Sequence, residues 1–225
     1  NSEDGIDVKA KNVTITNAVS YDNGFAGLKV WSNEHLEGST RVPGTNRFTV
    51  NNLLAYNNAE DGVKCHGADL TASNITSVGN GQYGLYETIF ELARDAGIWS
   101  GPCKATIRNS IFANNQETAV YYARVDNETT QINSTNNFYY HPLSPAQTII
   151  IQECRTISDQ VINGALGLIS FDQLLRAVIV CNIARYSGYD TSGRSVDPQF
   201  VSIPNNNYRL MPTSPAIGSG YQYPQ

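Results

Sequence analysis

RFTVNNLLAYNN, at residues 47–58, is one of four closely similar segments in this chain of 225 residues. The other three are NVTITNAVSYDN at 12–23, DLTASNITSVGN at 69–80 and KATIRNSIFANN at 104–115. In all four the third residue is Thr, and the sixth and the last residues are Asn. Each segment alternates apolar and polar residues and is bounded by Gly and Asn, which is typical of β-strands that end at turns. The repetition indicates that the chain passes the same structural position several times.

The segments begin 35, 22 and 35 residues apart, so the basic repeat is 22 residues. Two repeats carry the same 13-residue insertion, at about 32–45 and 88–102. Repeats of this length, with a strand periodicity of two and no helical face, predict a parallel β-solenoid. We therefore expect an all-β fold with about six solenoid turns over 1–140, and a C-terminal cap and closing segment, packed on the same solenoid, over 141–225.

The aligned Asn residues predict inward ladders, in which each side-chain amide hydrogen-bonds to the next turn and to turn carbonyls. Identical residues would stack about 4.8 Å apart on successive turns. Asn74 lies in one of these columns and also begins the glycosylation sequon Asn-Ile-Thr. We expect this sequon to be buried and unmodified.

The repeat weakens after about residue 130, where QINSTNNFYY (131–140) is interpreted as one more, imperfect turn. The segment SFDQLLRAVIVCNIARYSG (170–188) has a different pattern. Ser170 and Gln173 match a capping box, the apolar residues from Leu174 to Ile183 have helical spacing, and Gly188 follows as a stop signal. We predict a helix here that covers an open end of the solenoid.

Composition excludes several classes of protein. The net charge of −5 argues against a nucleic-acid partner, and no run of 18 apolar residues is present to span a membrane. The three histidines lie on separate segments without metal spacing, and no Ser or Cys nucleophile has a His in a recognised arrangement. Cys154 and Cys181 remain open, because four cysteines in a chain of this length are compatible with a disulfide and with reduced thiols.

The tail DTSGRSVDPQFVSIPNNNYRLMPTSPAIGSG (190–220) carries the phrases DPQF, YRL and SPAIGSG. It resembles the closing segment of many secreted right-handed parallel β-helix proteins that act on polysaccharides. AYNNAEDGVK (55–64) is similar to their repeats. The resemblance implies a right-handed parallel β-helix in an extracellular protein, with a carbohydrate as its ligand.

A Gly or Ala follows four residues after the last Asn of each segment, and the residue two positions further is expected to point outward. This predicts an outward row of Asp7, Lys29, Lys64, Tyr86 and Tyr121, and beside it a second row that includes Lys9, Trp31 and His66. Aromatic and imidazole side chains make Trp31, His66, Tyr86 and Tyr121 candidates for substrate binding. Because the first insertion begins beside Trp31, we expect the two insertions to wall one side of a ligand groove. In the alternative interpretation, Asp7 and Lys29 form only a cross-strand ion pair and the tyrosines only favour strands.

The phrase EDGID (3–7) is similar to the Asp-Asp-Gly-x-Asp phrase of the pectate lyases of polysaccharide lyase family 9. The resemblance implies that Glu3, Asp4 and Asp7 bind Ca²⁺ and that Lys29, or its rival Lys64, is the catalytic base. Calcium prefers carboxylate oxygens, and beside a uronate it would acidify the C5 proton. A second ammonium group one turn away would lower the pKa of the base. A weaker acidic cluster is present at 60–61.

The expected function is therefore calcium-dependent β-elimination of an acidic, uronate-containing polysaccharide outside the cell. The alternative is a non-catalytic protein. A β-solenoid can act as a structural, adhesive or sugar-binding subunit, and such subunits can stack end to end into filaments.

Overall fold

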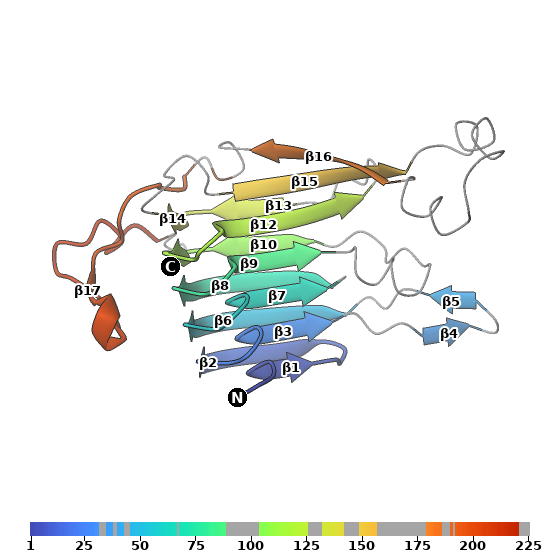
Figure 1. Ribbon diagram of the computed structural model, residues 1–225, viewed down its shortest axis with the longest axis horizontal. Coiled ribbons are helices and arrows are strands. Elements are labelled where there is room, and N and C mark those ends of the chain that lie inside the picture. The colour runs from blue at the N-terminus through green and yellow to red at the C-terminus, as the bar shows by residue number, and fades with distance from the viewer. Residues whose placement is uncertain are drawn as a thin grey trace, which may run out of the picture.

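The structure is a computed structural model that describes residues 1–31, 35–37, 40–42, 46–66, 68–88, 104–125, 132–141, 149–156, 179–185, 190 and 192–220. Within these residues the protein is all-β, with two seven-stranded sheets and two two-stranded sheets (Figure 1). The one helical element of the described residues is a 3-10 turn, η1 (Ile203–Asn205).

The first sheet has the strand order β1-β3-β7-β9-β12-β15-β16. Its strands are β1 (Ile6–Val8), β3 (Leu28–Trp31), β7 (Val63–His66), β9 (Tyr83–Thr88), β12 (Thr118–Val125), β15 (Ile149–Thr156) and β16 (Ile179–Arg185). The second sheet contains β2 (Val13–Tyr21), β6 (Arg47–Tyr56), β8 (Asp69–Val78), β10 (Ala105–Arg108), β11 (Ile111–Ala113), β13 (Ile132–Thr135) and β14 (Phe138–Tyr140). The small sheets pair β4 (His35–Glu37) with β5 (Thr40–Val42), and β17 (Phe200–Ser202) with β18 (Asn207–Leu210).

The chain alternates between the two large sheets from β1 to β15. Figure 1 shows the strands rising in chain order, from β1 and β2 near the N-terminus to β15 and β16 at the opposite end. Every pair within the two large sheets is parallel except the last, β15 with β16. Parallel neighbours need a crossover between them, and here each crossover runs through a strand of the other sheet.

The strand register agrees with the sequence alignment. Thr14 pairs with Thr49, Thr49 with Thr71, and Thr71 with Thr106, which are the offsets of 35, 22 and 35 residues found in the sequence. The imperfect repeat at 131–140 continues the sheet, because β13 pairs with β10 and β14 pairs with β11. The prediction that this segment is one more repeat is confirmed.

The core is one apolar cluster formed by inward residues of both large sheets. Strand β3 has the alternating pattern expected of a half-buried strand, with Leu28 and Val30 fully buried and Lys29 between them half-exposed. The second sheet contributes larger side chains, such as Phe48, Leu70 and Phe112. This alternation determines which residues of the first sheet remain available on its outer face.

One of the two predicted Asn ladders lies inside the protein. Asn23, Asn58, Asn80 and Asn115 are buried, and the Nδ2 of each of the first three donates a hydrogen bond to Oδ1 of the next at 2.8–2.9 Å. The backbone N–H of Asn58 also donates to Asn80. These bonds satisfy polar groups that would otherwise be buried without partners.

The other Asn column lies at the surface, so the prediction that Asn74 is buried is wrong. Asn17, Asn52 and Asn74 are exposed, and Asn109 is half-buried. All four have φ between 52° and 57°, in the left-handed region. Asn tolerates this conformation better than most residues, and the column therefore reflects a sharp backbone bend between strand segments.

The prediction of a helix at 170–188 is wrong for its C-terminal part. Ile179–Arg185 forms strand β16, which pairs antiparallel with β15. The β-branched residues of IVCNI suit a strand, and pairing with the edge of β15 outweighs the helical spacing of the apolar residues. Ser170, Gln173 and Gly188, which suggested the ends of that helix, lie outside the described residues.

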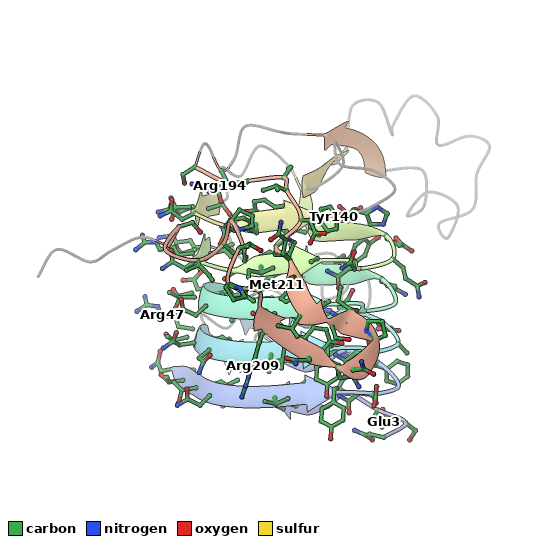
Figure 2. All side chains as sticks on the ribbon, turned by 90° about the vertical axis from the view of Figure 1, so that its left-hand side faces the viewer. Glu3, Arg47, Tyr140, Arg194, Arg209 and Met211 are labelled. Atoms are coloured by element: carbon green, nitrogen blue, oxygen red, sulfur yellow. The ribbon has the colours of Figure 1, made fainter. Side chains whose placement is uncertain are left out.

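The tail first extends the second sheet and then packs on its outer face. Arg194 forms a parallel bridge to Phe138. Phe200 and Tyr208 of the small β17–β18 sheet join a second apolar cluster with Tyr56 and Val78. Figure 2 shows the tail passing from Arg194 across this face to Met211 and Arg209.

Candidate functional site

The outer face of the first sheet carries the predicted outward row: Asp7, Lys29, Lys64, Tyr86 and Tyr121. Each member is the register partner of the next on the neighbouring strand. Asp7 is exposed and the other four are half-buried. The row therefore changes from a carboxylate through two ammonium groups to two phenol rings as it crosses five strands.

Asp4 holds Lys29 at the start of this row. One Asp4 oxygen, Oδ2, lies 3.5 Å from Lys29 Nζ. The other, Oδ1, accepts a hydrogen bond from the backbone N–H of Ala26 at 2.8 Å. Both oxygens of Asp4 are thus engaged by the neighbouring repeat.

Four neighbouring side chains contact Trp31. Its indole Nε1 donates a 2.6 Å hydrogen bond to Asp7 Oδ1. The ammonium groups of Lys9 and Lys29 lie 4.3 and 4.0 Å from its ring centroid, within cation–π range. The His66 ring packs against it in an edge arrangement with centroids 4.6 Å apart. A sugar ring that stacked on the Trp31 indole would therefore also lie close to the ammonium groups of Lys9 and Lys29.

Two of the three predicted calcium ligands, Asp4 and Asp7, have other partners in this structure. Among the residues that the structure describes, no group of three or more His, Cys, Asp or Glu side chains is placed to hold a metal ion. Asp4 is engaged by Lys29 and Ala26, and Asp7 by Trp31. A calcium ion at Glu3, Asp4 and Asp7 would require both aspartates to exchange these partners. Calcium binding there stays a prediction.

Lys64 lies among carboxylates of its own repeat. Its Nζ is 3.2 Å from Glu60 Oε2 and 3.9 Å from Asp61 Oδ2. Asp61 is fully buried, and its Oδ1 accepts a hydrogen bond from the backbone N–H of Tyr83 at 3.2 Å. Burial raises the pKa of Asp61 to about 7, although Lys64 and this hydrogen bond oppose the increase. Asp61 corresponds to Asp4 in the first repeat, and each carboxylate binds a backbone N–H of the following repeat.

His66 packs against two aromatic rings of the outer face and is covered by its neighbours. Its side chain is fully buried, with its ring between those of Trp31 (4.6 Å) and Tyr86 (6.3 Å). Burial, together with the charges of Lys64, Lys29 and Lys9, lowers the pKa of His66 to about 3. The imidazole is therefore neutral at physiological pH, and a role of His66 in substrate binding stays a prediction.

The other end of the row is a cluster of three tyrosines. Tyr83 stacks on Tyr121 at 4.8 Å and on Tyr86 at 5.3 Å, and Tyr86 lies 5.5 Å from Tyr121. Lys64 Nζ is 5.6 Å from the centroid of Tyr86, so the cation and aromatic parts of the row meet here. Burial raises the pKa of Tyr121 to about 12, which keeps the phenol neutral.

Tyr83 was not among the residues predicted from the sequence. Burial raises the pKa of its hydroxyl, and a hydrogen bond to Glu117 adds to the increase. Tyr83 directly precedes the Gly column, at the position that Asp61 occupies in the previous repeat. The repeat alignment already places Tyr83 beside the row, but it does not show that its ring stacks on two members of the row.

The first insertion is described in part. The described part of the first insertion is an antiparallel hairpin, β4–β5, which extends beyond the end of β3 (Figure 1). Most of the second insertion lies outside the described residues. The prediction that both insertions wall one groove therefore stays a prediction.

Comparison of the chain with protein-family models, with curated proteins and with solved structures finds no match. The described residues contain no helix that is both long and apolar enough to cross a membrane.

Proposed function

We propose that the protein binds an acidic polysaccharide along the outer face of the first sheet. The observation that carries this proposal is the continuous row from Lys29 through Lys64 and Tyr86 to Tyr121, held in register on four neighbouring strands. Ammonium groups pair with uronate carboxylates, and phenol rings stack on the apolar faces of sugar rings. An extended polysaccharide can make both kinds of contact at once, because the side chains of the row lie along a line.

The spacing of the row supports an extended, repeating ligand. Neighbouring strands of a sheet lie about 4.8 Å apart, so successive side chains of the row repeat at that interval. A compact ligand would meet only one or two of them. The lysines are already oriented by Asp4 and Glu60, which lowers the entropic cost of ordering them when the ligand binds.

The proposal extends to the architecture and the location of the protein. The alternation of strands between two parallel sheets supports a right-handed parallel β-helix of about six turns. With the resemblance of the tail at 190–220 to secreted β-helix proteins, this supports an extracellular protein.

A second candidate function is β-elimination on the same ligand. It is favoured by the register pairing of Lys29 with Lys64, which places two candidate bases side by side on adjacent strands. In that reaction the neutral lysine takes the C5 proton of a uronate, and the sugar linked at C4 leaves. The ion pairs of the two lysines with Asp4 and Glu60 act against it, because the lysine that serves as the base would have to leave its carboxylate partner.

Calorimetric titration with polygalacturonate, and with a neutral glucan as ligand control, tests the binding proposal. Replacing both lysines, Lys29→Ala with Lys64→Ala, should weaken binding of polygalacturonate at least tenfold and reduce its dependence on salt. Lys104→Ala removes an exposed lysine that lies outside this row and should leave the affinity unchanged. Equal affinity of the wild type for the neutral glucan, or no loss in the double variant, would refute the proposal.

The same preparations separate binding from catalysis. Formation of the unsaturated product, followed by its ultraviolet absorbance with and without a calcium chelator, would establish β-elimination. Lys29→Arg should then be nearly inactive, because a guanidinium does not accept a proton at neutral pH. Binding without product would leave the protein as a non-catalytic polysaccharide-binding protein.

A further inference from the structure

The last two strands of the first sheet bring two cysteines to facing positions. Cys154 in β15 and Cys181 in β16 are register partners in an antiparallel pair. Such partners lie on the same face of the sheet, with Cα atoms about 4.5 or 5.5 Å apart depending on the type of pair. A disulfide requires a Cα separation of about 4.4–6.8 Å, so either type satisfies it. We propose that Cys154 and Cys181 form a disulfide that joins β16 to β15.

The topology excludes Cys65 as an alternative partner for either residue. Cys65 lies in the core on β7, and β9 and β12 separate β7 from β15 in the sheet. Three strand spacings place Cys65 roughly 14 Å from β15. Cysteines whose Cα atoms are more than about 7 Å apart cannot be bridged without movement of the backbone. The fourth cysteine, Cys103, lies outside the described residues.

At this position the disulfide would keep strand β16 attached to the sheet. Strand β16 is the antiparallel strand at the end of the first sheet, and its contacts in that sheet are to β15 alone. An end strand has one paired edge and is the easiest to detach. A covalent bond across the pair closes the loop from residue 154 to 181 and reduces the entropy of the unfolded chain.

The bond forms by ordinary thiol–disulfide exchange. The thiolate of one cysteine attacks a disulfide oxidant, such as oxidised glutathione, and releases one thiol. The thiolate of the second cysteine then displaces the other half of the oxidant. Two protein thiols lose two electrons and two protons, and one molecule of oxidant is reduced to two thiols.

Peptide mapping by mass spectrometry tests the linkage. The intact chain is equilibrated in a buffer of reduced and oxidised glutathione and then denatured with an alkylating reagent but no reductant. We expect one cross-linked species that joins the peptides of Cys154 and Cys181, two hydrogens lighter than their sum, with Cys65 alkylated. Alkylation of both Cys154 and Cys181, or a link from either to another cysteine, would overturn the proposal.

Thermal melting tests the role of the bond. Reduction should lower the Tm of the wild type by roughly 5–15 °C, from the usual stabilisation by a disulfide in a chain of this size. The double variant Cys154→Ser with Cys181→Ser should melt at the same temperature with and without reductant. An equal effect of reductant on both proteins would show that another bond is responsible.

Discussion

At the scale of single residues, Asp61 and His66 are buried groups whose pKa values are displaced toward their neutral forms. Burial raises the pKa of Asp61 from 3.8 to about 7 and lowers that of His66 from 6.5 to about 3. A carboxyl with a raised pKa in the folded state destabilises the protein as the pH rises from about 4 to 7. An imidazole with a lowered pKa destabilises it as the pH falls from 6.5 to about 3. The two slopes oppose each other between about pH 4 and 6.5.

The variant Asp61→Asn should separate these contributions. Asparagine keeps the shape of the side chain but does not ionise, so the loss of stability with rising pH should disappear. At pH 8 we expect the variant to exceed the wild type by a few kcal/mol, and at pH 3.5 we expect similar stabilities. Urea denaturation from pH 3.5 to 8 measures this difference. A constant difference across that range would show that Asp61 titrates near its ordinary pKa.

The buried Asn ladder gives a second prediction at this scale. Asn80 accepts hydrogen bonds from the backbone and the side chain of Asn58, and donates to Asn115 and Ser77. Asn80→Ala leaves several buried groups without partners and should cost about 3 kcal/mol in urea denaturation. Asn74→Gly is the control, because Asn74 is exposed and glycine readily adopts its positive φ. A small effect of Asn80→Ala would mean that water replaces the amide.

At the scale of elements, the tail is attached to the stack of strands through Asp190. Its Oδ2 accepts hydrogen bonds from the backbone and side chain of Asn137 at 3.1 and 2.8 Å, and from the Tyr139 hydroxyl at 3.1 Å. Ser192 donates to its other oxygen through its N–H and its hydroxyl. Asp190 is buried. It accepts the Asn137 Nδ2 hydrogen bond, as the Asn of the following repeat does in the buried Asn ladder.

Asp190→Ala should therefore detach the start of the tail. Three buried donors lose their acceptor, and we expect a loss of about 3 kcal/mol together with faster proteolysis of the C-terminal segment. Asp197→Ala is the matched control in the same tail. Asp197 is exposed and caps only the N–H of Gln199, so its loss should cost less than about 1 kcal/mol. Equal effects of the two variants would contradict the anchoring role of Asp190.

At the scale of the whole molecule, the strand register is independent of the insertions. Repeats separated by 35 residues and by 22 residues have the same strand pairing. Fifteen residues, 32–46, join β3 to β6, whereas Gly67 and Ala68 suffice between β7 and β8. Two residues are therefore enough to connect the two sheets at this point, and the insertion is not needed for the connection.

Replacing residues 32–46 with Gly-Ala should leave a folded protein. Among the described contacts, the variant loses the hydrogen bond from Asn46 Nδ2 to the carbonyl of Trp31, while the new Ala can still offer a carbonyl to the N–H of Asp69. Because a shorter loop costs less entropy to close, we expect a Tm within about 5 °C of the wild type and an unchanged far-ultraviolet circular dichroism spectrum. Weaker binding of polygalacturonate in a folded variant would support the groove-wall prediction. A molten or aggregated product would show that the insertion belongs to the core.

The sequence by itself determined the repeat, the parallel register and the order of the outward row. Side chains of a strand alternate with a period of two, and parallel repeats align identical positions, so the alignment of Thr14 with Thr49 also places Lys29 beside Lys64. This inference needs only the pattern along the chain.

The tertiary structure alone decided what surrounds those positions. His66 is buried because the rings of Trp31 and Tyr86 enclose it, and Ile179–Arg185 is a strand because β15 offers it an edge. Asn74 is exposed because its column forms a backbone bend while the column of Asn80 lies inside. Burial, pKa and pairing partner depend on contacts between residues distant in sequence, and periodicity along the chain does not specify those contacts.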